Sequence, residues 1–176
     1  MLFRSEELAK IFTSTVYGAT AGEEERREIR RLRMRMENEL AKEKKGSYNI
    51  KTGRGGIVDV EFIVQYLQLK FGRDHEVIRS PSTVAALKAI RLERLIADSD
   101  IETLFTGYKF LRRLENRLRI IHDYSMNDLS GSPEYLDKLA RQLGYDLKLR
   151  HPGEIFMAEY ESITSAIRDC FDKVFE

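Results

Sequence analysis

The fold is decided by residues 46–71, GSYNIKTGRGGIVDVEFIVQYLQLKF. Four glycines precede Ile57 and favour a turn, and from Ile57 onward apolar side chains fall on nearly every side of a helix. A helix that is apolar all round packs in the middle of a bundle. The stretch therefore predicts a glycine-rich turn followed by a central, buried helix over residues 57–71.

Helical signals continue on both sides of this stretch. Each of the three prolines follows a serine or a histidine and precedes an amphipathic segment, which is typical of a helix start. Ser99 and Glu102 have the spacing of a capping box at another start. We expect seven helices, near residues 5–16, 22–45, 57–71, 81–91, 100–124, 133–143 and 153–175. Only residues 48–51 favour an extended conformation, so the expected class is an all-α bundle of mostly antiparallel helices.

Length and composition limit the classes of protein. The 176 residues suffice for one ordinary domain, and we expect a single helical domain over residues 1–176, of which 1–20 form an N-terminal arm or a helix from a preceding linker. Thirty Lys and Arg against 29 Asp and Glu give a net charge of +1. A nucleic-acid or anionic-membrane binder would carry a clear basic excess, so neither partner is expected.

The single cysteine and the hydropathy favour a cytoplasmic protein. Cys170 has no second cysteine with which to form an internal disulfide, and it lies near an apolar stripe, so we interpret it as a packed thiol. The sequence has no apolar run near the ~20 residues that span a bilayer, and its first residues do not resemble a signal peptide.

Two acids on the central helix require an explanation. Glu61 shares a narrow polar stripe with Gln65 and Gln68, whereas Asp59 points elsewhere in the first turn. A buried carboxylate is unfavourable unless it is paired. The candidate partners are arginines of the fifth helix: Arg112, Arg113, Arg117 and Arg119. The pairs either fix the register of the helices or organise the edge of a nucleotide or partner site.

The glycine-rich turn also has two interpretations. Backbone N–H groups at a helix entrance, with cations beside them, can bind a phosphate. The residues that would make such contacts are Lys51, Gly53, Arg54, Gly55 and Gly56. The pattern is neither a P-loop nor the dinucleotide fingerprint, and a tight helix-entry turn explains the glycines about as well.

The second helix has six arginines between residues 26 and 35. Four glutamates over residues 23–28 lie beside them, which is typical of a solvated face, and the alternative is a surface that faces an anion or a partner protein. Its expected apolar stripe is Ile29, Leu32, Met36 and Leu40.

Arrangements typical of catalytic sites are missing from the sequence. Asp59 and Glu61 diverge by about 200° on a helix, so they do not form the paired carboxylates of a two-metal site. His75, His122 and His151 are scattered, and none begins a zinc-binding His-Glu-x-x-His helix. We therefore expect neither catalytic residues nor metal ligands in this chain.

Residues 49–69, NIKTGRGGIVDVEFIVQYLQL, resemble the signature of the bacterial glutamine synthetase adenylyltransferase family, also called glutamate-ammonia-ligase adenylyltransferase. Further blocks agree in order: LRMRMENEL before it, then SPSTVAALKAIRLERLI, YKFLRRLENRLRIIHDYSMNDL and LARQLGY after it. The resemblance is therefore specific, and it runs from about residue 28 to residue 145.

The resemblance implies a large bifunctional parent enzyme. Members have two nucleotidyltransferase units, each followed by a helical domain, and they transfer AMP from ATP to a tyrosine of glutamine synthetase or remove it by phosphorolysis. PII signalling proteins and glutamine set the balance. This chain resembles one helical domain, and the aspartate motif that holds Mg²⁺ would lie before residue 1. The fragment alone is expected to be inactive and to bind no cofactor, whereas the parent uses ATP and Mg²⁺.

By the same resemblance, Lys51 and Arg54 are the best candidates for phosphate contact, and Asp59 and Glu61 are motif acids that organise the site. The form Gly-Gly-Ile-Val-Asp-Val-Glu-Phe is more similar to the C-terminal, adenylylating half. The expected partners are glutamine synthetase, a PII protein and the catalytic domain of the parent chain. Two alternatives stay open: a regulatory docking module for PII or glutamine synthetase without nucleotide contact, and a structural spacer between catalytic units.

Overall fold

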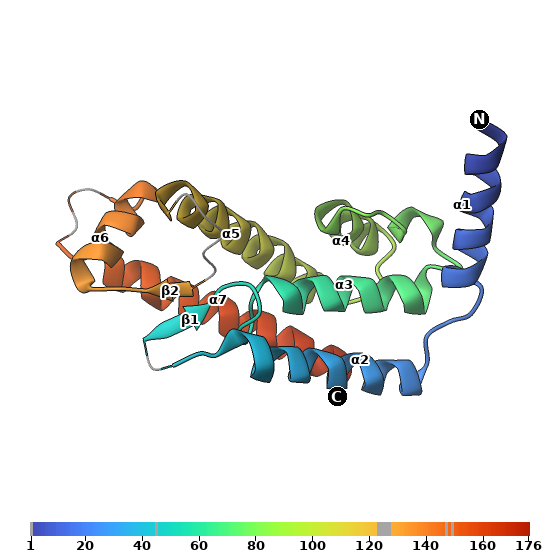
Figure 1. Cartoon of the computed structure of the whole chain (residues 1–176), viewed down its shortest axis with the longest axis horizontal. Coiled ribbons are helices and arrows are strands. Elements are labelled where there is room, and N and C mark those ends of the chain that lie inside the picture. Colours follow the sequence, from blue (N-terminus) through green and yellow to red (C-terminus); the bar gives the residue numbers. More distant parts are fainter. Residues whose placement is uncertain (1, 45, 123–127, 147, 149) are drawn as a thin grey trace.

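The structure is a computed structural model that describes residues 2–44, 46–122, 128–146, 148 and 150–176. Within these ranges the seven α-helices are α1 (Leu2–Tyr17), α2 (Glu23–Met36), α3 (Ile57–Phe71), α4 (Thr83–Leu92), α5 (Asp98–His122), α6 (Pro133–Gln142) and α7 (Pro152–Phe175) (Figure 1). Short elements complete the fold: a π-helix (Glu37–Ala41), a 3-10 helix (Glu76–Ile78), and strands β1 (Ser47–Asn49) and β2 (Asp128–Ser130). The all-α class is confirmed.

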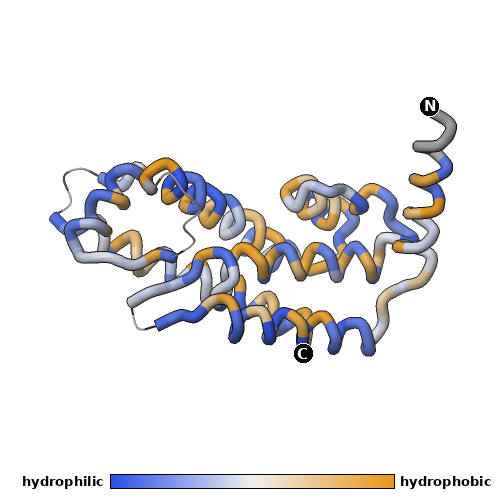
Figure 2. The backbone as a smooth tube through the Cα atoms, viewed as in Figure 1, coloured by the Kyte–Doolittle hydropathy of each residue, from blue (hydrophilic) through white to orange (hydrophobic). Residues whose placement is uncertain are grey.

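Helix α3 lies in the middle of the molecule, as its all-round apolar character predicts. It packs against α2, α4, α5 and α7, and Figure 2 shows apolar residues along its whole length. Its buried residues are Ile57, Val58, Asp59, Val60, Ile63, Val64, Tyr66 and Leu67. Asp59 is the exception among them, because it is a charged group inside an otherwise apolar surface.

Helices α5 and α7 supply most of the rest of the core. Leu104, Leu111 and Leu118 of α5 are fully buried, which fits their seven-residue spacing. On α7, Phe156, Ile167 and Phe171 are fully buried as well. Helix α6 packs on α7 at the end of the bundle opposite α1 (Figure 1).

Two boundaries differ from those that the sequence predicts. The second predicted helix ends with the π-helix at Ala41 rather than near residue 45, because Lys42 takes a left-handed conformation with φ of 49°. Helix α5 already begins at Asp98, so Ser99 lies inside it and does not cap it. The end predicted near residue 124 lies outside the described residues.

The extended segment predicted near 48–51 is strand β1, which pairs with β2 in an antiparallel ladder from Ser47 and Ser130 to Asn49 and Asp128. The second strand has no sequence signal of its own. A three-residue strand is too short to show an alternating pattern, so its partner alone defines it.

Helix α1 stands at one end of the molecule and makes few contacts with the other helices (Figure 1). Leu8, Ile11 and Phe12 are largely exposed on it. Tyr17, at its end, places its ring under the Arg79 guanidinium. In the described part of the chain, every helix is too short or too polar to cross a membrane.

Candidate functional site

The glycine-rich turn closes on itself through backbone hydrogen bonds. The N–H of Gly53 donates to Asn49 O at 2.8 Å, and the N–H of Gly56 donates to Gly53 O at 3.0 Å. The next two amides, of Ile57 and Val58, donate to Ile50 O and Lys51 O, each at 3.0 Å. The first turn of α3 is therefore satisfied by residues of the chain that precede it.

Gly55 is the position where only glycine fits. Its φ of +68° lies in the left-handed region, and a β-carbon there would overlap the backbone carbonyl of Thr164 on α7. The N–H of Gly55 donates to Asp59 Oδ2 at 2.7 Å. The turn is thus pressed against α7 on one side and tied to the Asp59 carboxylate on the other.

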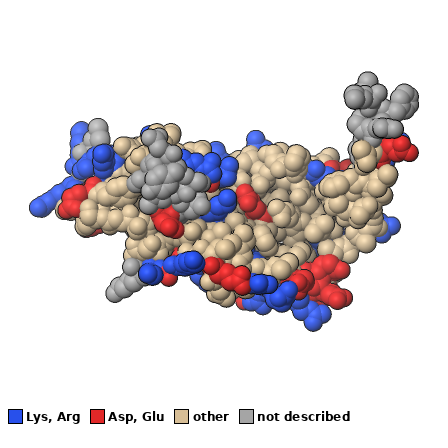
Figure 3. Space-filling view, viewed as in Figure 1, with Lys and Arg blue, Asp and Glu red and all other residues tan. Residues whose placement is uncertain are grey.

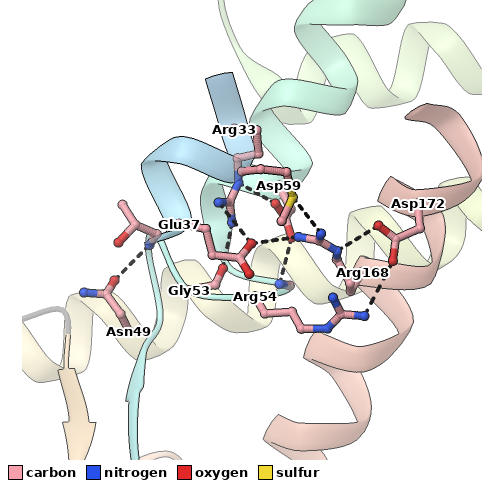
Figure 4. A network of polar contacts seen from close by, with 11 residues as sticks. Arg33, Glu37, Asn49, Gly53, Arg54, Asp59, Arg168 and Asp172 are labelled. Atoms are coloured by element: carbon pink, nitrogen blue, oxygen red, sulfur yellow. Dashed lines mark hydrogen bonds and ion pairs between the residues drawn. The ribbon is translucent and has the colours of Figure 1, made fainter. Parts of the chain in front are cut away.

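Asp59 is the centre of a buried network of charges (Figure 4). Its Oδ1 lies 2.5 Å from Arg33 Nε of α2, and neither side chain is exposed. Its Oδ2 lies 3.6 Å from Arg168 Nη1 of α7. Arg33 Nη2 also donates to Gly53 O at 2.8 Å. One carboxylate therefore connects α2, α3, α7 and the glycine-rich turn.

Two further acids extend the network toward the surface. Glu37 Oε2 lies 3.3 Å from Arg33 Nη1 and 2.8 Å from Arg168 Nη1. Asp172 accepts from Arg168 Nε at 2.9 Å and lies 3.5 Å from Arg54 Nη2. Glu37 lies at the start of the π-helix that continues α2.

Burial and charge act in opposite directions on these groups. Burial raises the pKa of the Asp59 carboxyl, and the positive charges of Arg33 and Arg168 offset only part of that rise. Burial alone would lower the pKa of Arg168, but the carboxylates of Asp59, Glu37 and Asp172 outweigh it and raise that pKa. The network therefore holds the Arg168 guanidinium charged.

The structure corrects the predicted partners of the two motif acids. Asp59 pairs with Arg33 and Arg168, not with the arginines of α5. Arg112 and Arg119 instead pair with Glu115, a fully buried acid of α5, at 3.0 and 2.9 Å. The prediction failed because it considered the arginines of one neighbouring helix only, whereas Asp59 faces α2 and α7.

Arg33 and Arg168 are the residues that sequence reasoning missed. Arg33 lies on the inner face of α2, where an apolar side chain was expected, while Leu32 and Leu40 of the predicted stripe are 44% and 54% exposed. The available signal was the buried Asp59 itself, which requires a nearby cation. Arg168 is also buried, on the apolar side of α7.

The other motif acid, Glu61, faces away from this network. Tyr108 of α5 donates its hydroxyl to Glu61 Oε1 at 3.1 Å. Asp59 and Glu61 therefore lie on different sides of α3, as their spacing on a helix predicts. In the described ranges, no group of three or more His, Cys, Asp or Glu side chains is arranged to hold a metal ion.

Glu61 lines an open groove of about 720 Å³ between α3, α4 and α5, which we call the α5 groove. Its lining includes three of the four predicted arginines, Arg112, Arg113 and Arg117. Arg113 donates to the Leu143 carbonyl that follows α6. Although no ion pair joins Glu61 to these described arginines, they line the same groove.

The residues predicted to contact phosphate all lie at the turn, but they differ in how accessible their binding groups are to a ligand. The N–H groups of Gly53, Gly55 and Gly56 are already used within the chain, which favours the helix-entry role of these glycines. The Arg54 side chain is 57% exposed, and Lys51 is half-buried. Phosphate contact through these two cations stays a prediction.

The remaining candidates have ordinary surroundings. His75 Nδ1 lies 2.6 Å from Glu93, and His151 Nδ1 lies 3.8 Å from Asp137, both near the surface. Cys170 is buried, which confirms its interpretation as a packed thiol. The side chain of His122 lies outside the described residues.

The fold and the site together define a helical bundle in which a glycine-rich turn is fixed to a buried acidic centre. Residues 25–175 match the family described as GlnD PII-uridylyltransferase, and the chain belongs to this family. The match omits α1 and covers all of the elements that surround Asp59.

Several curated relatives carry the name "Bifunctional glutamine synthetase adenylyltransferase/adenylyl-removing enzyme". That of Leifsonia xyli subsp. xyli is 31% identical over 162 residues, which are 90% of this chain and 16% of the relative. Those of Neisseria meningitidis serogroup A and Xanthobacter autotrophicus are 35% and 39% identical over 67% and 56% of this chain. The chain spans 10% to 16% of the length of such relatives, and the resemblance seen in the sequence is confirmed.

Proposed function

We propose that this chain is the helical domain of a larger cytoplasmic enzyme that attaches AMP to glutamine synthetase and removes it. The observation that carries the proposal is the match, over most of this chain, to a small part of relatives named for both reactions. In this proposal the nucleotidyltransferase unit binds ATP and Mg²⁺. The helical domain supplies a rigid surface beside it.

The Asp59 network supports the proposal that the helical domain supplies a rigid surface beside the nucleotidyltransferase unit. A buried charge network specifies position, because each of its members is fixed by several partners at once. Asp59 ties the turn to α2 and α7, and Arg54 projects from the same turn at the surface. We infer that the turn presents Arg54 and Lys51 toward the phosphates of ATP in the assembled enzyme, and that the domain belongs to the C-terminal, adenylylating half.

A chimera tests this function. In the Leifsonia xyli relative, the segment that matches this chain is replaced by this chain, and the rate of AMP transfer is measured with ATP and glutamine synthetase varied separately. Removing both charges, with Lys51→Ala and Arg54→Ala, is expected to raise KM for ATP severalfold and to leave KM for glutamine synthetase unchanged. The control is Arg35→Ala, an exposed arginine whose one ion-pair partner in the described part of the chain is Glu39.

The same experiment separates the alternative functions. If the domain is a docking module for glutamine synthetase or a PII protein, charge changes on α2 should weaken its affinity for that protein and leave KM for ATP constant. If it is a structural spacer, neither this affinity nor KM for ATP should change. An unchanged KM for ATP in the Lys51 and Arg54 variant would exclude phosphate contact by these two residues.

A further inference from the structure

The α5 groove is lined by an excess of positive charge. Lys109, Arg112, Arg113 and Arg117 line it from α5, against the single carboxylate of Glu61. Figure 3 shows lysine and arginine side chains gathered over the middle of α5 on the face toward the viewer. A protein whose charges almost cancel overall thus has a concave, cationic surface at this groove.

Folding alone does not explain this row of cations. Lys109, Arg113 and Arg117 follow one another at four-residue spacing, and like charges at that spacing destabilise a helix by about 0.2–0.5 kcal/mol per pair. Among the described residues, Lys109 and Arg117 have no carboxylate within 4.0 Å, and Lys109 lies only over the Phe105 ring. These two cations are therefore free to bind a ligand.

Glu115 holds one of the other cations in place. Its carboxylate is fully buried, and it lies 3.0 Å from Arg112 Nη1 on one side and 2.9 Å from Arg119 Nη2 on the other. Arg112 also places its guanidinium near the Tyr108 ring, 5.9 Å from the ring centre. The groove is thus lined by a guanidinium fixed by Glu115 as well as by Lys109 and Arg117, which have no carboxylate partner among the described residues.

The groove has acidic and hydroxyl groups beside its cations. Glu61 accepts from Tyr108 at 3.1 Å, and Ser82 and Thr83 line the same groove at the start of α4. Burial raises the pKa of the Tyr108 hydroxyl, so it stays a hydrogen-bond donor at neutral pH. These acceptors and hydroxyl groups suit the hydroxyl or amino groups of a ligand.

We propose that the α5 groove binds the phosphate groups of a small phosphorylated molecule. Guanidinium groups bind phosphate oxygens through paired, charge-assisted hydrogen bonds, and several cations in one row match a chain of phosphates rather than a single anion. The volume of about 720 Å³ falls within the range of small-molecule sites. The residues are distinct from Lys51 and Arg54, so this site is independent of the proposed function.

Titration calorimetry on the whole 176-residue chain tests the site, with pyrophosphate, ATP, inorganic phosphate and citrate as separate probes. We expect pyrophosphate and ATP to bind more tightly than citrate, and the affinity to fall as salt rises. Equal affinities for pyrophosphate and ATP would assign recognition to phosphate alone. A tighter ATP complex would show that the groove also contacts the nucleoside.

Neither Lys109 nor Arg117 has an ion-pair partner in the part of the chain that the structure describes, so we expect changes at these residues to preserve the fold. The double change Lys109→Glu and Arg117→Glu is expected to weaken pyrophosphate and ATP binding by about tenfold or more. The control is Lys88→Glu with Arg141→Glu, which makes the same change in net charge on exposed residues outside the groove. The proposal is overturned if the unaltered chain binds neither pyrophosphate nor ATP, if citrate binds as tightly, or if the control loses as much affinity.

Discussion

At the scale of single residues, Asp59 has the largest effect that the structure predicts on stability. It is fully buried between Arg33 and Arg168, and removing one partner of a buried ion pair leaves the other charge uncompensated, at a cost of about 3–5 kcal/mol. Asp59→Asn should therefore lower the free energy of unfolding by about that amount in urea titrations. Glu28→Gln, which breaks the exposed Arg31 pair, should change it little. Equal effects of the two changes would contradict the structural role of the network.

Gly55 gives a second prediction at this scale, with Gly46 as its control. Both have positive φ, +68° and +78°, but only Gly55 lies against Thr164, whereas a β-carbon at Gly46 would meet no atom within 4 Å. Gly46→Ala should cost about 1 kcal/mol from backbone strain alone. Gly55→Ala should cost clearly more, because α7 must move, and chemical denaturation of the two variants measures the difference. Matching losses would show that the turn is not packed against α7.

The buried thiol of Cys170 makes the free energy of unfolding depend on pH. Burial raises its pKa from 9.0 to about 11. Between these values the native state holds more protons than the unfolded chain, so stability is complete below about pH 9 and falls as the pH rises toward 11. The difference in unfolding free energy between the unaltered chain and Cys170→Ala should therefore change over this window. Parallel curves for the two proteins would contradict the burial of the thiol.

The sequence indicated which glycines and acids lie at the site, but it did not indicate which side chains pair with them. That Asp59 must be paired follows from its place on an apolar helix, and its burial agrees. Arg33 was not predictable from periodicity, because an arginine on the inner face of a helix contradicts the usual pattern and is favoured only by a carboxylate that is distant in sequence.

At the scale of elements, helices were predictable because each carries its own periodic pattern and some also carry a start signal. Ser82 and Ser132 accept hydrogen bonds from the amides three residues on, at the starts of α4 and α6. The small sheet was only half predictable, since Asp128–Ser130 becomes a strand through pairing with β1. The predicted helix boundaries were wrong where a single backbone conformation ends the helix, as at Lys42.

Helix α1 should be less stable than α3. Leu8, Ile11 and Phe12 are 65%, 58% and 67% exposed, whereas most of α3 is buried by four neighbouring helices. Amides in α1 should therefore exchange with deuterium much faster than those in α3. Hydrogen-exchange mass spectrometry on the whole chain measures this, and comparable protection of the two helices would show that α1 is part of the cooperative core.

At the scale of the whole molecule, the structure combines one rigid charge network with one open cationic groove. The two lie on different sides of α3, since Asp59 faces α2 and α7 while Glu61 faces α5. The central helix thus separates a surface that positions the glycine-rich turn from a surface suited to phosphate. Variants of one can be made without altering the other.

The central claim is that this chain is the helical domain of an enzyme that modifies glutamine synthetase. The most direct measurement is the incorporation of labelled AMP into glutamine synthetase by three proteins: the Leifsonia xyli relative, the same protein without its matching segment, and the chimera that carries this chain in its place. We predict that the chimera transfers AMP well above the deletion. A chimera that melts cooperatively near the Tm of the relative, yet transfers no more AMP than the deletion, would contradict the claim.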